Sequence, residues 1–181
     1  MRILHVIGCL DAGDSAQQLC LLAPALAGHG HTTEIACIGG ADRQADELRR
    51  QGIAVHRLGW TRWFDVAAIF GLRRLLHDGC WDAVHAWDVP ALRASGLIAW
   101  NAAPVVISWP SRPKNLRWWD RRIFRRVRRV VVSSEWEHQR CLCEGLSAEW
   151  LRFIPPAAPA AQPGVQDVDE AALAFEPTRT A

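Results

Sequence analysis

The residues near the N-terminus with the clearest chemical potential form a loop of small side chains after a short apolar run. The candidates are Gly8, Gly13, Asp14 and Ser15. Small residues at a strand end let backbone N–H groups approach a phosphate, whose charge the dipole of a following helix stabilises. Asp14 argues against this role, because its carboxylate would repel a diphosphate. Asp14 or Ser15 would instead make a good helix N-cap, so both interpretations remain open.

Other polar and aromatic residues stand where further predicted strands end. They are His85, Trp87, Ser108, Trp109, Ser134 and Glu135. A histidine there can hydrogen-bond a substrate hydroxyl, although a single strand histidine is more often a structural residue. Ser134 and Glu135 also fit an N-cap followed by an acid in the first helical turn. None of the six is identified as catalytic by its spacing.

Residues 112–129 are the most basic part of the chain, and Asp120 is their single acid. Apolar residues such as Ile123 and Val127 recur beside the arginines at helical spacing. This pattern fits a helix on an anionic membrane, or a core-facing apolar stripe with a solvated arginine face. The candidates for a membrane or anion surface are Arg117, Trp118, Arg121, Arg122, Arg125 and Arg126. Nucleic acid is disfavoured, because no recognition motif accompanies them and the net charge is only +2.

Alternating strands and helices must position these residues. Strand-like runs occur at 3–8, 34–38, 54–58, 83–87, 105–109 and 130–133. Helix-period segments follow them near 15–27, 45–51, 66–77, 90–100, 118–126 and 135–144. This alternation predicts an α/β fold whose parallel sheet has helices on both faces. Such sheets bind ligands at the carboxyl ends of their strands, where strand order reverses.

Composition favours a globular, cytoplasmic protein. The chain has 181 residues, of which 50% are hydrophobic and 22% charged. Its six cysteines show no zinc-type spacing, so we expect reduced, buried thiols and no metal site. The apolar N-terminal run is too short to cross a bilayer and is a poor signal peptide. We expect a domain at 1–154 and a disordered, Pro/Ala-rich, linker-like tail at 155–181.

Six short motifs together resemble family-4 glycosyltransferases. They are HVIGxLxxG at 5–13, LxxLAxxLAxxGH at 19–31, GIxVHRL at 52–58, DAVHAW at 82–87, VVVSSE at 130–135 and LRFIPP at 151–156. Their order and intervals are similar to those of the family over about residues 1–160. The resemblance implies one Rossmann-like half of a GT-B fold. In that fold the N-terminal domain takes the acceptor and the C-terminal domain binds the nucleotide sugar.

The resemblance assigns roles, and the chain departs from it in places. It implies that the six strand-end residues line the acceptor side and that the first loop faces the donor diphosphate. Where the family has Gly-Gly this chain has Gly13 and Asp14, and where it often has Glu the chain has Ala16. The Thr-x-His motif reads Ser108, Trp109 and Pro110, so an acceptor contact is missing. We expect the C-terminal acidic motif of the family to lie well beyond residue 181, outside this sequence.

The leading hypothesis is a glycosyltransferase-like N-terminal domain, related to retaining enzymes that transfer a sugar from a nucleotide donor to a lipid or glycan. We expect it to be inactive without a donor-binding domain. The alternative is a non-catalytic module, from a truncated or split enzyme, that binds an acceptor, a membrane or a partner. The expected substrate is a UDP- or GDP-linked sugar, with no covalently bound cofactor. Expected partners are a separate donor-domain chain or a second copy, with peripheral contact at the inner face of an anionic membrane.

Overall fold

The structure is a computed structural model that describes most residues before 158. It covers residues 1–11, 13–39, 43–59, 65–98, 103–108, 118–124 and 127–157, without the side chains of residues 43, 97, 98, 118, 119 and 121. Several sequence candidates therefore lie outside the described residues. They are Trp109, Arg117, Arg125, Arg126 and the side chains of Trp118 and Arg121. The tail from residue 158 onward lies outside them as well.

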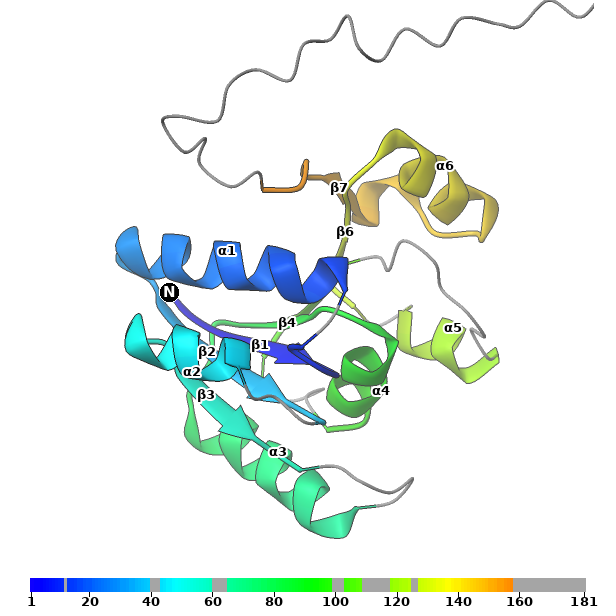
Figure 1. Ribbon diagram of the computed structural model, residues 1–181. Coiled ribbons are helices and arrows are strands. Elements are labelled where there is room, and N and C mark those ends of the chain that lie inside the picture. Colours follow the sequence, from blue (N-terminus) through cyan, green and yellow to red (C-terminus); the bar gives the residue numbers. More distant parts are fainter. Residues whose placement is uncertain are drawn as a thin grey trace, which may run out of the picture.

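Seven parallel strands form one sheet in the described part of the chain (Figure 1). They are β1 Arg2–Ile7, β2 Thr32–Cys37, β3 Ala54–Arg57, β4 Ala83–Ala86, β5 Val105–Ser108, β6 Arg129–Val132 and β7 Leu151–Phe153. Their order is β3-β2-β1-β4-β5-β6-β7. The order reverses between β1 and β4, which places the topological switch point at the carboxyl ends of these two strands. The predicted parallel α/β sheet is confirmed, whereas β7 was not predicted.

Helices cover both faces of this sheet. They are α1 Asp14–Gly28, α2 Arg43–Arg50, α3 Val66–Asp78, α4 Val89–Ile98, α5 Trp118–Phe124 and α6 Glu135–Cys143, with a 3-10 turn η1 at Ala148–Trp150. One buried cluster packs α1 and α2 against one face of the sheet. A second cluster packs the four helices α3, α4, α5 and α6 against the other face. Strand β1 supplies both clusters, because successive side chains of a strand point to opposite faces. Leu4 and Val6 belong to the α3 side and Ile7 to the α1 side.

Helices α3 and α6 each begin with a side-chain cap, whereas α1 does not. Asp65 accepts a hydrogen bond from the N–H of Ala68 at the start of α3. Ser134 accepts one from the N–H of Glu137 at the start of α6, which confirms the predicted N-cap there. The predicted cap of α1 by Asp14 or Ser15 is wrong. Gly13 is the N-cap, with a φ of 100°, and no side chain caps this helix. Such a backbone conformation favours glycine.

The apolar residues described at the end of α5 and just after it face the core. Ile123 and Phe124 of the helix are 9% and 4% exposed, and Val127, which follows it, is 6% exposed. The carboxylate of Asp120 is fully buried and accepts hydrogen bonds from Nε and Nη2 of Arg93, at 2.8 and 2.7 Å. This ion pair ties α5 to α4 and raises the pKa of Arg93 through its hydrogen bonds to Asp120. For the described residues, the apolar stripe therefore faces the core.

All six cysteines are free thiols, as predicted, but only some of them are buried. Cys37 and Cys141 are buried, and desolvation raises their pKa to about 11 and about 12. Cys9, Cys80 and Cys143 are exposed, which corrects the prediction of buried thiols for these three. They lie in the first loop, a turn and the end of α6, where no helix or strand covers them. No helix in the described ranges combines the length and hydropathy that crossing a membrane requires.

Candidate functional site

The switch point is closed by a carboxylate that bridges two strands. Asp88 follows β4, and its Oδ2 accepts a hydrogen bond from the N–H of Gly8 at 2.8 Å. Its Oδ1 accepts a second bond from the N–H of Ala91 in the first turn of α4, also at 2.8 Å. A side chain at Gly8 would place its Cβ only 2.7 Å from Asp88 Oδ2. Gly8 is therefore needed for close approach, and its N–H already has a partner.

Asp88 was not among the residues that the sequence singled out. Burial raises the pKa of its carboxyl, while the two backbone N–H groups act in the opposite direction. An acid three residues before Ala91, at a strand-to-helix junction, is the ordinary signal of an N-cap. That signal could have identified the residue, but not its second bond to β1.

The first loop keeps one feature of an anion site and loses another. Because no side chain caps α1, the first N–H groups of that helix remain available to a ligand. However, Asp14 lies in the first turn of the helix, and Asp11 precedes it on the exposed loop. Both carboxylates oppose a diphosphate. Ser15, the remaining loop candidate, is partly buried in the same turn.

Two histidines and a tryptophan form a cluster across β1 and β4. The ring centroids of His85 and Trp87 lie 4.5 Å apart, and those of His5 and His85 lie 5.6 Å apart. The Nε1–H of Trp87 donates to Nδ1 of His5 at 3.2 Å, so a neutral His5 carries its proton on Nε2. That Nε2 is buried and has no hydrogen-bond partner. Trp87 is only 5% exposed, so its indole lies within the core and supports the histidines from there.

The side chain of His85 reaches across to the neighbouring strand. Its Nε2 lies 2.9 Å from Oγ of Ser108, at the carboxyl end of β5. Desolvation lowers the pKa of His85 to about 3, with a smaller contribution from the charge of His5, and burial lowers the pKa of His5 to about 4. Both rings are therefore neutral at pH 7. A neutral imidazole can donate or accept a hydrogen bond to a hydroxyl, but with so low a pKa it is a weak general base.

The end of β6 is organised around the buried acid Glu137. Oε2 of Glu137 accepts hydrogen bonds from both the N–H and the hydroxyl of Ser133, each at 2.7 Å. Ser134 is occupied as the cap of α6. Glu135 is the exposed member of the group: its side chain is 75% exposed, and its Oε1 accepts a hydrogen bond from Nε2 of Gln139 at 2.8 Å. Of the two candidates from the sequence, Glu135 is thus the one that can meet a ligand without disturbing the helix.

The basic segment is only partly described. Arg122 is exposed on α5, while the other five surface candidates lie outside the described residues or have no described side chain. Since Asp120 binds Arg93 in the interior, the segment has no solvent-facing acid to balance its arginines. An anion-binding surface stays a prediction there.

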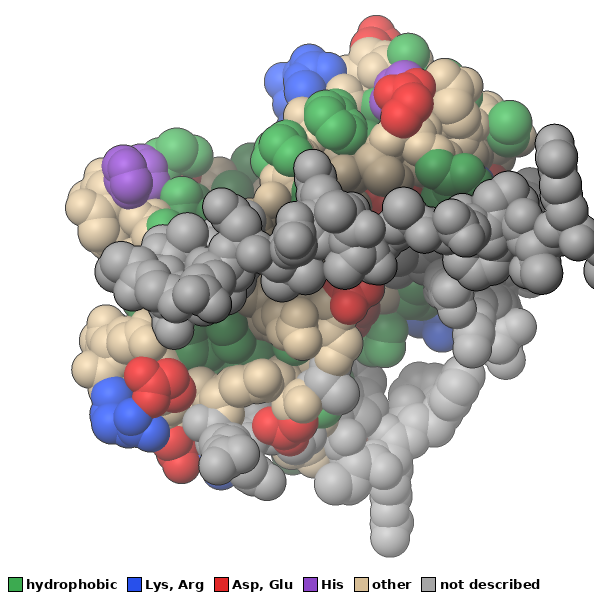
Figure 2. Space-filling view, turned by 45° about the horizontal axis from the view of Figure 1, so that its top comes forward, with side chains coloured by type: hydrophobic (Ala, Val, Ile, Leu, Met, Phe, Trp, Pro, Cys, Tyr) green, Lys and Arg blue, Asp and Glu red, His purple; other side chains and the backbone are tan. Residues whose placement is uncertain are grey.

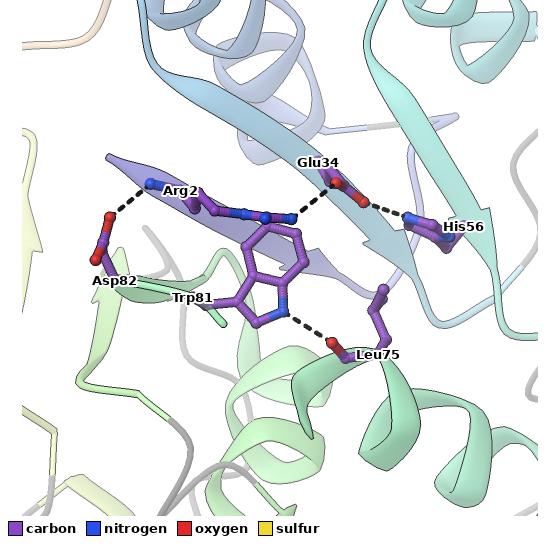
Figure 3. A network of polar contacts seen from close by, with 6 residues as sticks. All are labelled: Arg2, Glu34, His56, Leu75, Trp81 and Asp82. Atoms are coloured by element: carbon purple, nitrogen blue, oxygen red, sulfur yellow. Dashed lines mark hydrogen bonds and ion pairs between the residues drawn. The ribbon is translucent and has the colours of Figure 1, made fainter. Parts of the chain in front are cut away.

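A second polar cluster lies at the opposite ends of the strands (Figure 3). Nη2 of Arg2 lies 3.9 Å from Oε1 of Glu34, whose Oε2 is 2.7 Å from Nε2 of His56. The guanidinium of Arg2 also lies over the ring of Trp81, at 5.3 Å from its centroid. With part of α3, these groups line an open depression of about 390 Å³. Glu34 thus has two basic partners, and Asp82 accepts a hydrogen bond from the backbone N–H of Arg2 at 2.7 Å, so this end of the sheet is held together by its own polar contacts.

The fold and its switch point define a Rossmann-like α/β domain, and the comparisons with known proteins place it among GT-B-type domains. The family model described as "Glycosyl transferase 4-like domain" matches residues 15–157. The chain therefore belongs to this family. No curated protein sequence matches the chain.

Similar solved structures share the fold at low sequence identity. HepE of Anabaena, in complex with UDP and glucose, has a TM-score of 0.69 at 17% identity over 87% of this chain and 45% of its own. A glycosyltransferase from Rickettsia africae has a TM-score of 0.67 at 17% identity, over 85% of this chain and 42% of its own. UDP-GlcNAc 2-epimerase from Neisseria meningitidis, bound to UDP-GlcNAc, has a TM-score of 0.63 at 18% identity, over 84% of this chain and 46% of its own. The chain spans less than half the length of these neighbours.

Proposed function

We propose that this chain is the acceptor-side domain of a glycosyltransferase related to retaining enzymes, acting on a hydroxyl of a lipid or glycan. The observation that carries this proposal is the pair formed by His85 and Ser108 at the carboxyl ends of β4 and β5. The imidazole of His85 and the hydroxyl of Ser108 can give up the hydrogen bond between them, and each can then form a hydrogen bond to the hydroxyl of a sugar or lipid. Glu135 and the first loop lie on the same edge of the sheet.

The donor in this proposal is a UDP- or GDP-linked sugar. HepE is in complex with UDP and glucose, and the meningococcal epimerase is bound to UDP-GlcNAc, which supports a uridine donor. Because the chain covers less than half of such neighbours, we assign the main donor contacts to a second domain or chain. In this assignment the uncapped start of α1 contributes only a secondary contact with the diphosphate.

A non-catalytic binding module is the second candidate function. It is favoured by the carboxylates of Asp14 and Asp11, which oppose a diphosphate at the first loop. It is also favoured by the low pKa of His85, which makes proton abstraction at neutral pH inefficient. In this role the chain holds an acceptor or a partner, and chemistry takes place elsewhere.

A partner chain or a second copy of this chain would cover apolar surface on α6 and β7. Trp136, Phe153 and Ile154 are 57%, 57% and 53% exposed. Hydrophobic side chains come to the surface of the upper lobe in Figure 2, which α6 and β7 form in Figure 1. Exposed patches of this kind favour association. We further propose a cytoplasmic location with peripheral contact at the inner face of the membrane.

The experiment that tests the assignment is a fluorescence titration of the ten tryptophans with UDP, GDP, UDP-glucose and GDP-mannose. It uses the purified chain alone and then with any co-encoded donor-domain chain. Saturable binding only with the partner supports a split transferase. Tight binding by the chain alone would contradict the acceptor-side assignment, and no binding in either case would favour the binding module.

A further inference from the structure

Helix α3 carries apolar side chains on two opposite faces. Ala68, Leu72 and Leu76 are at most 2% exposed and pack into the core. On the other side, Val66 and Phe70 are 62% and 63% exposed. They are four residues apart, so their side chains are neighbours on the helix surface. The outward face of a helix on a globular domain is normally polar, and these two residues have no role in the core.

We call the exposed side of α3, which begins with Val66 and Phe70, its outward stripe. One turn further along the helix, this outward stripe becomes basic. Arg73 is exposed, and the side chains of Arg74 and His77 are 85% and 88% exposed. At a rotation of about 100° per residue, these three side chains fall on the side of Val66 and Phe70. The nearby acid is Asp78, at the edge of the stripe, where it pairs with Arg74 and His77. The stripe thus has an apolar first half and a basic second half.

From these observations we propose that the outward stripe of α3 is a docking surface for an anionic lipid bilayer. Phe70 and Val66 enter the boundary between headgroups and acyl chains, and the arginines of the next turn bind the anionic headgroups. Helix α3 lies at the outer edge of the domain, at the bottom in Figure 1, and no other described helix covers its outer side. The proposal does not depend on glycosyl transfer.

This surface differs from the one that the sequence suggested. The described apolar residues of α5, Ile123 and Phe124, are buried, so these two side chains do not face a bilayer. Helix α3 offers both components that interfacial binding requires. A protein partner could also cover an apolar stripe, but the neighbouring arginines favour a surface dense in negative charge over a neutral one.

The test is sedimentation of the purified full chain with vesicles of phosphatidylcholine containing about 30% phosphatidylglycerol, and with vesicles of pure phosphatidylcholine. We expect binding to the anionic vesicles and much less to the neutral ones. Phe70→Ser should weaken binding about tenfold through the lost apolar contact. Arg73→Gln and Arg74→Gln should each weaken it about fivefold.

Two controls match these variants on other surfaces. Trp136→Ser removes an exposed aromatic that lies beside Arg140 on α6, and Arg50→Gln removes an exposed, ion-paired arginine on α2. Both should leave binding unchanged, and circular dichroism should show every variant to be folded. The proposal is overturned if the wild-type chain does not sediment or if the α3 variants bind like wild type. It also fails if Phe70→Ser changes the oligomeric state in solution and not the affinity for vesicles.

Discussion

The polar clusters at the two ends of the sheet use the same kinds of residue in opposite ways. At the carboxyl end, His5, His85 and Trp87 meet in the interior, and both imidazoles are held neutral. At the amino end, His56 bonds a carboxylate and Trp81 lies under Arg2, in an open depression. In both clusters the indole N–H is satisfied, by His5 Nδ1 in one and by the carbonyl of Leu75 in the other. The difference indicates that desolvation suits one cluster to uncharged ligand groups, while ion pairing makes the other a structural tie.

Acid should act most strongly on the carboxyl-end cluster. The pKa of His5 is about 4 in the folded chain and 6.5 in an unfolded one, so its stabilising contribution is present above pH 6.5. It is lost as the pH falls toward 4, because only the unfolded chain gains the proton, and the loss is about 3 kcal/mol. Urea unfolding between pH 7.5 and 4 measures the free energy of unfolding as a function of pH. His5→Asn should make that free energy less dependent on pH. An unchanged slope in that variant would refute the account.

At the amino end, a methyl group added beside Trp81 should be the most damaging single change. A Cβ at Gly79 would lie 2.1 Å from Nε1 of Trp81. We expect Gly79→Ala to lower the free energy of unfolding by about 2 to 3 kcal/mol, since the buried indole must move. The matched control is Gly28→Ala at the end of α1, where a Cβ meets nothing within 4 Å. If both variants unfold at the same urea concentration, Trp81 is not packed as described.

Removal of the carboxylate at the switch point should cost more than removal of an ordinary cap. Asp88→Ala loses the cap of α4 and leaves the N–H of Gly8 without its partner, so we expect about 2 kcal/mol. Asp65→Ala loses only the cap of α3, with an expected cost of about 1 kcal/mol. Thermal and urea unfolding of the two variants measure the difference. Equal losses would mean that the bond between Asp88 and β1 adds nothing.

Much of this arrangement could be predicted from the sequence, because apolar runs and helix-period segments alternate clearly along the chain. The six predicted strands are present with small changes at their ends. Strand β7 could not be predicted, since it has three residues and two of them are exposed. The cap of α1 was misassigned because a glycine with positive φ gives no side-chain signal.

The site was predicted in part. His85 and Ser108 were identified individually, but their contact depends on the pairing of β4 with β5. Asp88 was overlooked because a polar residue after a strand is also typical of a loop. The arginine-rich segment gave the correct period for α5, yet the period alone does not say whether the apolar side faces the core or a membrane. Burial of Ile123 and Val127 decides this for the described residues.

The central claim, that the carboxyl-end cluster receives an acceptor hydroxyl, is tested most directly by NMR. The imidazole of His85 and the indole N–H of Trp87 are followed while methyl β-glucoside or UDP is added to the chain, with His85→Gln as the comparison. The account predicts saturable shifts with the glucoside that disappear in the variant, and none of this size with UDP. Shifts at these two side chains with UDP alone would contradict it and place the donor on this half.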